Sequence, residues 1–110
     1  MPPILDFLRD SLGSFNIRAM KRGHEITTQL LDNTGLIDVL NELYDPVVRD
    51  EFSKNPMSFL GQRGITLPAG SLPPVVHEFA NGVWEVELTV VEGAYTYTNG
   101  FNSATGFYHR

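Results

Sequence analysis

Apolar residues in the first seventy positions recur at the spacing of helices. The first stripe has members three or four positions apart, the pattern of one helix face: Ile4, Leu5, Leu8 and Leu12. Pro2-Pro3 can open this helix and Gly13 can end it. Residues 24–31 predict a short helix at best. A second stripe follows a cap signal at Asn33: Leu36, Ile37, Leu40, Leu43 and Tyr44.

Two further helices are marked by a capping residue followed by proline. The side chain of aspartate or asparagine accepts a hydrogen bond from the first turn, and proline fits the first helical position. Asp45-Pro46 therefore predicts one helix, and Asn55-Pro56 predicts a short second one. Gly64 can end the second helix because glycine adopts the left-handed conformation readily. The N-terminal part is thus expected to be a group of short helices.

Residues 73–91 alternate apolar and polar side chains on both sides of Asn81-Gly82, which is a strong signal for a β-hairpin. With these two residues alone at the tip, His77 faces Val86. The buried face is then predicted to be Val75, His77, Phe79, Trp84, Val86, Leu88 and Val90. Glu78 faces Glu85 in this register, a like-charge pair that a one-residue bulge would relieve. The predicted fold class is α+β, with short helices followed by an antiparallel hairpin and room for a third strand.

Residues 93–110 differ in composition from everything before them. They contain no acidic residue but hold three of the four tyrosines. Tyr95 to Thr98 have strand-like alternation, and glycines then interrupt any regular element. The chain therefore divides into a helical N-terminal extension (1–44), a helix-and-hairpin segment (45–93) and a distinctive tail (94–110).

Composition excludes several functional classes. The 110 residues suffice for one domain, and 42% of them are hydrophobic, enough for a core. The net charge of -5 disfavours nucleic acid as a partner. The absence of cysteine excludes disulfides, zinc fingers, Fe–S clusters and thiol nucleophiles. No apolar run approaches a membrane span, and the charged start is unlike a signal peptide, so a cytoplasmic protein is expected.

A search for catalytic or metal-binding patterns finds none of the familiar ones. The three histidines, His24, His77 and His109, stand at no metal-ligand spacing, and no nucleophile elbow or phosphate-binding loop occurs. His77 is interpreted as a core-edge residue of the hairpin, and the basic cluster at 18–22 as a solvated helix face. The sequence therefore predicts no enzyme, no cofactor and no metal site.

The stretch DPVVRDEFSKNPMSFLGQRGITLPAG, followed by a hairpin, resembles the nitrile hydratase-like leader peptide family. These are leader regions of ribosomally synthesised, post-translationally modified peptides, including the proteusins. The resemblance covers residues 45–94 and lies in the order of its elements: an acidic helix, Asn-Pro, a Gly-Ile pair and Leu-Pro-x-Gly before valine-rich strands. It implies that the leader docks a modifying enzyme through residues of this stretch: Phe52, Asn55, Pro56, Phe59, Leu60, Ile65 and Leu67.

The resemblance also implies a cleavage site and a core peptide. Gly93-Ala94 stands where a small-residue site is expected, so a protease-transporter would cut after one of them and export the core. A mobile tail would let a modifying enzyme thread the core. The residues open to modification there are Tyr95, Thr96, Tyr97, Thr98, Asn99, Asn102, Ser103, Thr105 and Tyr108. The predicted function is a precursor of a modified peptide.

Alternative interpretations stay open from the sequence. The apolar residues of the motif can equally be core packing. The tail can be an extra strand, in which case it belongs to the fold and no core peptide exists. The chain would then be a non-catalytic binding module or small subunit that joins a partner through the hairpin edge. A small enzyme using His77 or His109 with a carboxylate is a third hypothesis.

Overall fold

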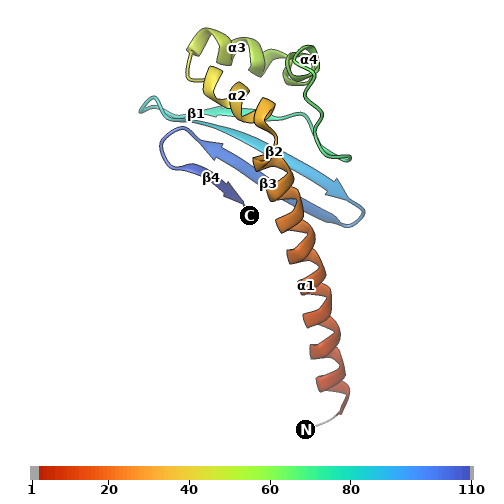
Figure 1. The fold of residues 1–110 in the computed structure, drawn as a ribbon. Helices are drawn as coiled ribbons and strands as arrows, with labels where there is room; N and C mark the ends of the chain where they lie inside the picture. The colour runs from red at the N-terminus through yellow and green to blue at the C-terminus, as the bar shows by residue number, and fades with distance from the viewer. Residues whose placement is uncertain (1–2, 110) are drawn as a thin grey trace.

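The computed structural model describes the backbone of residues 3–109 and the side chains of residues 17–109. Four helices precede a four-stranded antiparallel sheet (Figure 1): α1 Pro3–Leu31, α2 Thr34–Glu42, α3 Pro46–Lys54, α4 Pro56–Gln62, β1 Val75–Glu78, β2 Trp84–Glu92, β3 Tyr95–Asn102 and β4 Gly106–His109. The α+β class predicted from the sequence is confirmed.

The first helix is longer than the sequence predicted. α1 is one helix of 29 residues that continues through Gly13 and Gly23, and it extends well beyond the sheet in Figure 1. Glycine inside a helix costs only about 1 kcal/mol relative to alanine, so it does not by itself end one. The predicted stop at Gly13 is therefore wrong. The side chains of the stripe from Ile4 to Leu12 lie outside the described residues.

The caps of the other helices follow the sequence. The side chain of Asn33 accepts from Leu36 N (3.1 Å), and that of Asp45 accepts from Val47 N (2.9 Å). Asn55 caps α4 by accepting from Ser58 N (3.3 Å). Beyond α4, Gly64 has a φ of 69°, the left-handed conformation that ends a helix. These local signals fix where α2, α3 and α4 begin.

The hairpin exists, but its register differs by one residue from the prediction. Val76 pairs with Val86 and His77 with Glu85, so the predicted pairing of His77 with Val86 is wrong. The loop has three residues, 80–82, because Phe79 N donates to Val83 O (2.9 Å) and Gly82 has a φ of 83°. A three-residue loop with a left-handed glycine is a common hairpin connection. The extra loop residue also separates Glu78 from Glu85.

The one-residue shift in register changes which side chains of β1 face the core, but it does not change those of β2. Trp84, Val86, Leu88 and Val90 are buried as predicted, but Val75, His77 and Phe79 are exposed. Val76 instead packs against the core. Because side chains alternate along a strand, a one-residue shift exchanges its two faces.

We expect Val76→Thr to destabilise the protein by about 1 kcal/mol, because it places a hydroxyl against the core. Val75→Thr, one residue away on the solvent face, should change the free energy of unfolding by less than about 0.5 kcal/mol. Urea denaturation of both variants measures the difference. If Val75→Thr were the more destabilising variant, Val75 would be the buried residue, and the register with the two-residue turn would be the correct one.

The tail is part of the sheet. Residues 95–102 form β3, which pairs with all of β2 after Trp84, from Glu85↔Asn102 to Glu92↔Tyr95. β4 then pairs with the second half of β3, from Asn102↔Gly106 to Asn99↔His109. The sequence left residues 94–110 as either a mobile core peptide or an extra strand. In the structure they form the third strand of the sheet, β3, and a fourth strand, β4.

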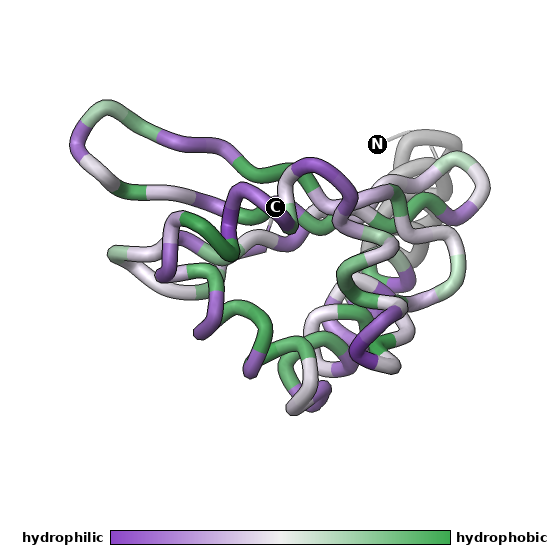
Figure 2. The backbone as a smooth tube through the Cα atoms, turned by 90° about the horizontal axis from the view of Figure 1, so that it is seen from above, coloured by the Kyte–Doolittle hydropathy of each residue, from purple (hydrophilic) through white to green (hydrophobic). Residues whose placement is uncertain are grey.

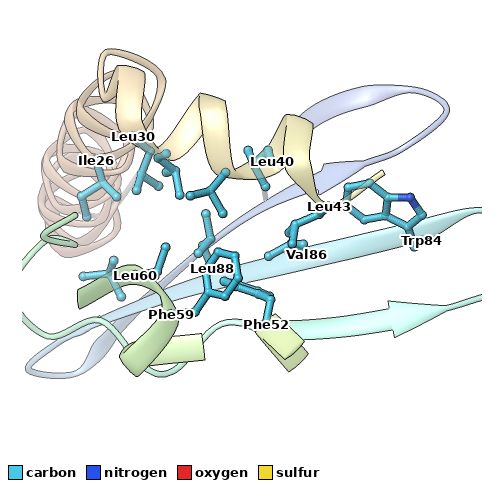
Figure 3. Packing of buried hydrophobic residues seen from close by; sticks show 13 residues of the cluster. Ile26, Leu30, Leu40, Leu43, Phe52, Phe59, Leu60, Trp84, Val86 and Leu88 are labelled. Atoms are coloured by element: carbon cyan, nitrogen blue, oxygen red, sulfur yellow. The ribbon is translucent and has the colours of Figure 1, made fainter. Parts of the chain in front are cut away.

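The core lies between the helices and one face of the sheet (Figure 3). It consists of Ile26, Leu30, Leu36, Val39, Leu40, Leu43, Phe52, Phe59, Leu60, Trp84, Val86, Leu88 and Val90. Figure 2 shows the hydrophobic and hydrophilic positions along the backbone, and they alternate along most of β2, whose sequence is WEVELTVVE, as a strand covered on one face requires. Every helix contributes to this cluster, so the sheet and helices form one folding unit.

Candidate functional site

The first half of β3 is an open sheet edge. β4 is opposite residues 99–102 only, and within the described residues it ends at His109. Ser103 N donates to Trp84 O (2.9 Å), and bonding alternates along an antiparallel ladder. Thr96 and Thr98 therefore direct their backbone groups away from β2, toward the open side. In the described part of the chain, no strand lies beside Thr96.

A groove of about 500 Å³ runs between this edge and α1. Its lining comes from three elements: Ala19, Met20, Gly23, His24, Tyr95, Thr96, Tyr97 and His109. Small residues on α1 let the helix approach the sheet closely, and a Cβ added at Gly23 would lie 3.4 Å from the ring of Tyr97. The rings of Tyr95 and Tyr97 stack with centroids 6.2 Å apart. Met20 is 72% exposed at the rim.

A hydrogen-bonded pair holds α1 against β3 below the groove. Asn99 is only 4% exposed, and its Oδ1 lies 2.8 Å from Thr27 Oγ1. Thr27 Oγ1 is also 2.9 Å from the carbonyl of Gly23. A hydroxyl has one proton, so Thr27 donates to Gly23 only if it accepts from the Asn99 amide, with the amide oxygen and nitrogen exchanged. This contact joins the two elements that line the groove, next to its lining residues Gly23 and Tyr97.

An ion pair also joins α1 to the end of β2. Arg22 donates to Glu92 at the end of β2, from Nε to Oε1 (2.8 Å) and from Nη2 to Oε2 (2.6 Å). These hydrogen bonds hold the pKa of Glu92 below its usual range and raise the pKa of Arg22. A smaller hollow of about 290 Å³ lies beside the pair, lined by Arg18, Ala19, Arg22, Tyr95 and Tyr97.

The ion pair between Arg22 and Glu92 predicts that the stability of the protein depends on pH. A carboxyl whose folded pKa is lowered stabilises the protein above its unfolded pKa, and that contribution disappears as pH falls through the folded pKa. The difference in melting temperature between wild type and Glu92→Gln should therefore shrink from neutral pH to below about pH 4. Glu51→Gln on α3 is the exposed-acid control. A difference that is independent of pH would contradict the assignment.

The residues predicted to dock a partner are mostly in the core. Phe52, Phe59 and Leu60 are buried, and Ile65 and Leu67 pack against the same cluster. Asn55 and Pro56 begin α4. The apolar residues of this set therefore pack in or against the core, which is the alternative that the sequence left open. Some of them also line a hollow of about 310 Å³ beside α4, with Met57, Leu60, Ile65 and Leu67 among its walls.

The predicted cleavage site lies in the turn between β2 and β3. Gly93 and Ala94 are both exposed, and Gly93 has a φ of 58°. Nine predicted modification sites follow it. Asn99 is buried, Thr96 and Thr105 are exposed, and the others are half-buried: Tyr95, Tyr97, Thr98, Asn102, Ser103 and Tyr108.

Several of these tail side chains have structural partners. Ser103 Oγ accepts from Trp84 N (3.0 Å). On the outer face, Asn102 Nδ2 (2.8 Å) and the Tyr108 hydroxyl (3.0 Å) both donate to Glu85. A modifying enzyme would have to open the sheet to reach the buried Asn99.

His77 is not at the edge of the core, because the register slip carries it to the outer face. Its Nε2 lies 2.9 Å from Glu87 Oε2. Among the residues that the structure describes, no cluster of three or more histidine, aspartate or glutamate side chains could hold a metal ion. No helix in the described part of the chain is both long and apolar enough to cross a membrane.

Sequence reasoning missed the groove because it joins residues about seventy positions apart. The one local signal is the Ala19-to-Gly23 spacing, which puts two small residues on one helix face. Comparison with protein-family models, curated proteins and solved structures finds no significant match to this chain.

Proposed function

We propose that the protein is a non-catalytic binding module whose sheet accepts an extended strand from a protein partner at the β3 edge. The observation that carries this proposal is that β4 covers only half of β3. The uncovered half adjoins a groove with two tyrosines on its wall. A strand added to a sheet edge gains main-chain hydrogen bonds, and its alternate side chains enter any pocket alongside. The groove therefore supplies what edge pairing requires.

Removing the backbone N–H of Thr96 tests the proposal. Thr96→Pro removes the donor that faces the open edge, whereas Thr96→Ala retains it. The tagged full-length chain, expressed in its native host, should co-purify with a protein that is retained by Thr96→Ala and lost from Thr96→Pro. Circular dichroism checks that both variants fold. A partner retained equally by both variants, or no partner at all, would count against edge pairing.

A precursor of a modified peptide is the second candidate. It is favoured by the exposure of Gly93 and Ala94 in a tight turn and by the leader-like order of residues 45–94. Residues 1 to about 93 would be the leader, and a cytoplasmic modifying enzyme and a protease-transporter would act on the rest. Cleavage there would separate β3 and β4 from the sheet, so modification would precede it or accompany unfolding of the tail.

Mass spectrometry tests the precursor directly. Protein from the native host is compared, intact and as fragments, with unmodified recombinant protein. The precursor requires a mass shift confined to residues 94–110, or a free peptide that begins near Ala94. An unmodified full-length chain while neighbouring genes are expressed would favour the binding module.

A further inference from the structure

We propose that Asn81 is a site of spontaneous covalent modification, at which the folded chain loses ammonia from the side-chain amide and becomes aspartate or isoaspartate. The proposal goes beyond the binding function and does not depend on it. It is carried by a comparison within one molecule, because the dipeptide Asn-Gly occurs twice, at residues 81–82 and at residues 99–100. The two copies have the same chemistry but opposite surroundings.

The reaction needs only water and a backbone that bends. The amide nitrogen of Gly82 gives its proton to solvent, attacks Cγ of Asn81 and forms a succinimide ring. The bond from Cγ to Nδ2 breaks, and the leaving nitrogen takes a proton from water and departs as ammonia. A water molecule then opens the ring at either carbonyl, which yields aspartate or isoaspartate. Glycine favours the attack because it has no Cβ beside the nitrogen and adopts many backbone conformations.

The structure leaves the first copy open. Asn81 and Gly82 are both exposed, in the three-residue loop between β1 and β2. Oδ1 of Asn81 accepts from Val83 N (3.2 Å), so the side chain is turned toward the residues that follow it. The N–H of Gly82 donates to Phe79 O (3.1 Å), a single bond at the surface that water can replace. Small movements of this loop therefore suffice to bring the Gly82 nitrogen onto Cγ of Asn81.

The second copy is held inside the sheet. Asn99 is 4% exposed, and its Oδ1 lies 2.8 Å from Thr27 Oγ1. Gly100 is paired with Glu87 on one side and with Tyr108 on the other, and the Tyr108 ring lies over it. Ring closure at this position requires β3 to leave the sheet, so its rate is reduced to that of the small fraction of molecules that are open.

Ageing of the recombinant full-length chain at mildly alkaline pH tests the proposal, in buffer and in guanidinium chloride. Cleavage after glutamate releases residues 79–85 with Asn81 and residues 93–110 with Asn99, and fragment masses place the change from NH2 to OH. In buffer we expect position 81 to convert at least about tenfold faster than position 99, which reacts only in opened molecules. In guanidinium chloride, where the sheet is lost, the two rates should become similar.

Asn81→Gln is the control for the site, because its longer side chain would have to close a larger and less favourable ring. This variant should show no mass gain in residues 79–85 and should leave position 99 as slow as in wild type. Equal rates at the two positions in buffer would show that the fold does not select the site. Conversion of both positions in guanidinium chloride but of neither in buffer would show that the loop protects Asn81, and would likewise overturn the proposal. No conversion in either solution would exclude the reaction itself.

Discussion

Replacing Trp84 with alanine should lower the free energy of unfolding by about 3 to 5 kcal/mol, the usual cost of removing a large buried aromatic ring. Trp84 is 2% exposed at the start of β2. Its ring is edge-on to that of Tyr44, between α2 and α3, with centroids 5.1 Å apart, and is tilted against that of Phe101 on β3, with centroids 5.7 Å apart. The guanidinium of Arg49 lies 5.3 Å from the ring centroid. Truncation would leave a cavity that three elements would have to fill.

Phe79→Ala is the matched control for this loss. Phe79 is also a large aromatic residue of the hairpin, but it is 48% exposed. Its truncation should change stability by less than about 1 kcal/mol. Urea denaturation of both variants measures the contrast. Comparable losses would mean that Phe79 is buried opposite Trp84, as the two-residue turn requires.

The fold was predictable wherever a side chain controls its own neighbourhood. Asp45 and Asn55 each accept a hydrogen bond within the turn that they begin, so the starts of α3 and α4 are encoded locally. The alternation of β2 is equally informative because one face of that strand is wholly covered. In both cases the signal and the structure it sets lie within a few residues of each other.

The errors arose where tertiary contacts decide. Asn81-Gly82 marks the hairpin but suits two loop lengths, and only packing of Val76 against the core selects the longer one. The short helix predicted over residues 24–31 is the end of the longer α1, which packs against β3 where Gly23 meets the ring of Tyr97. The groove arises from α1 meeting β3, and no local pattern announces a contact between such distant segments.

Glycine at position 100 should be required for the outer face of the sheet. Gly100 is opposite Tyr108 in the β3–β4 pairing. A Cβ added at Gly100 would fall well inside the van der Waals radius of the Tyr108 ring. The ring lies over the glycine, and its hydroxyl donates to Glu85 (3.0 Å). Gly100→Ala should therefore displace the ring and destabilise the protein by about 1 to 3 kcal/mol.

Two further variants separate this clash from other effects of alanine. Gly61→Ala makes the same change in α4, where a Cβ meets nothing within 4 Å, and it should raise stability by up to about 1 kcal/mol through helix propensity. In a double-mutant cycle, Tyr108→Ala should cost less in the Gly100→Ala background than in wild type, because the displaced ring has already lost its contacts. Additive losses would show that the ring does not depend on the glycine.

Because β3 is the one strand of the described sheet that pairs with β4, displacement of Tyr108, which also ties β4 to Glu85 of β2, should raise amide hydrogen exchange across residues 106–109. Position 100 thus couples the end of the tail to the sheet edge where we propose that a partner strand docks.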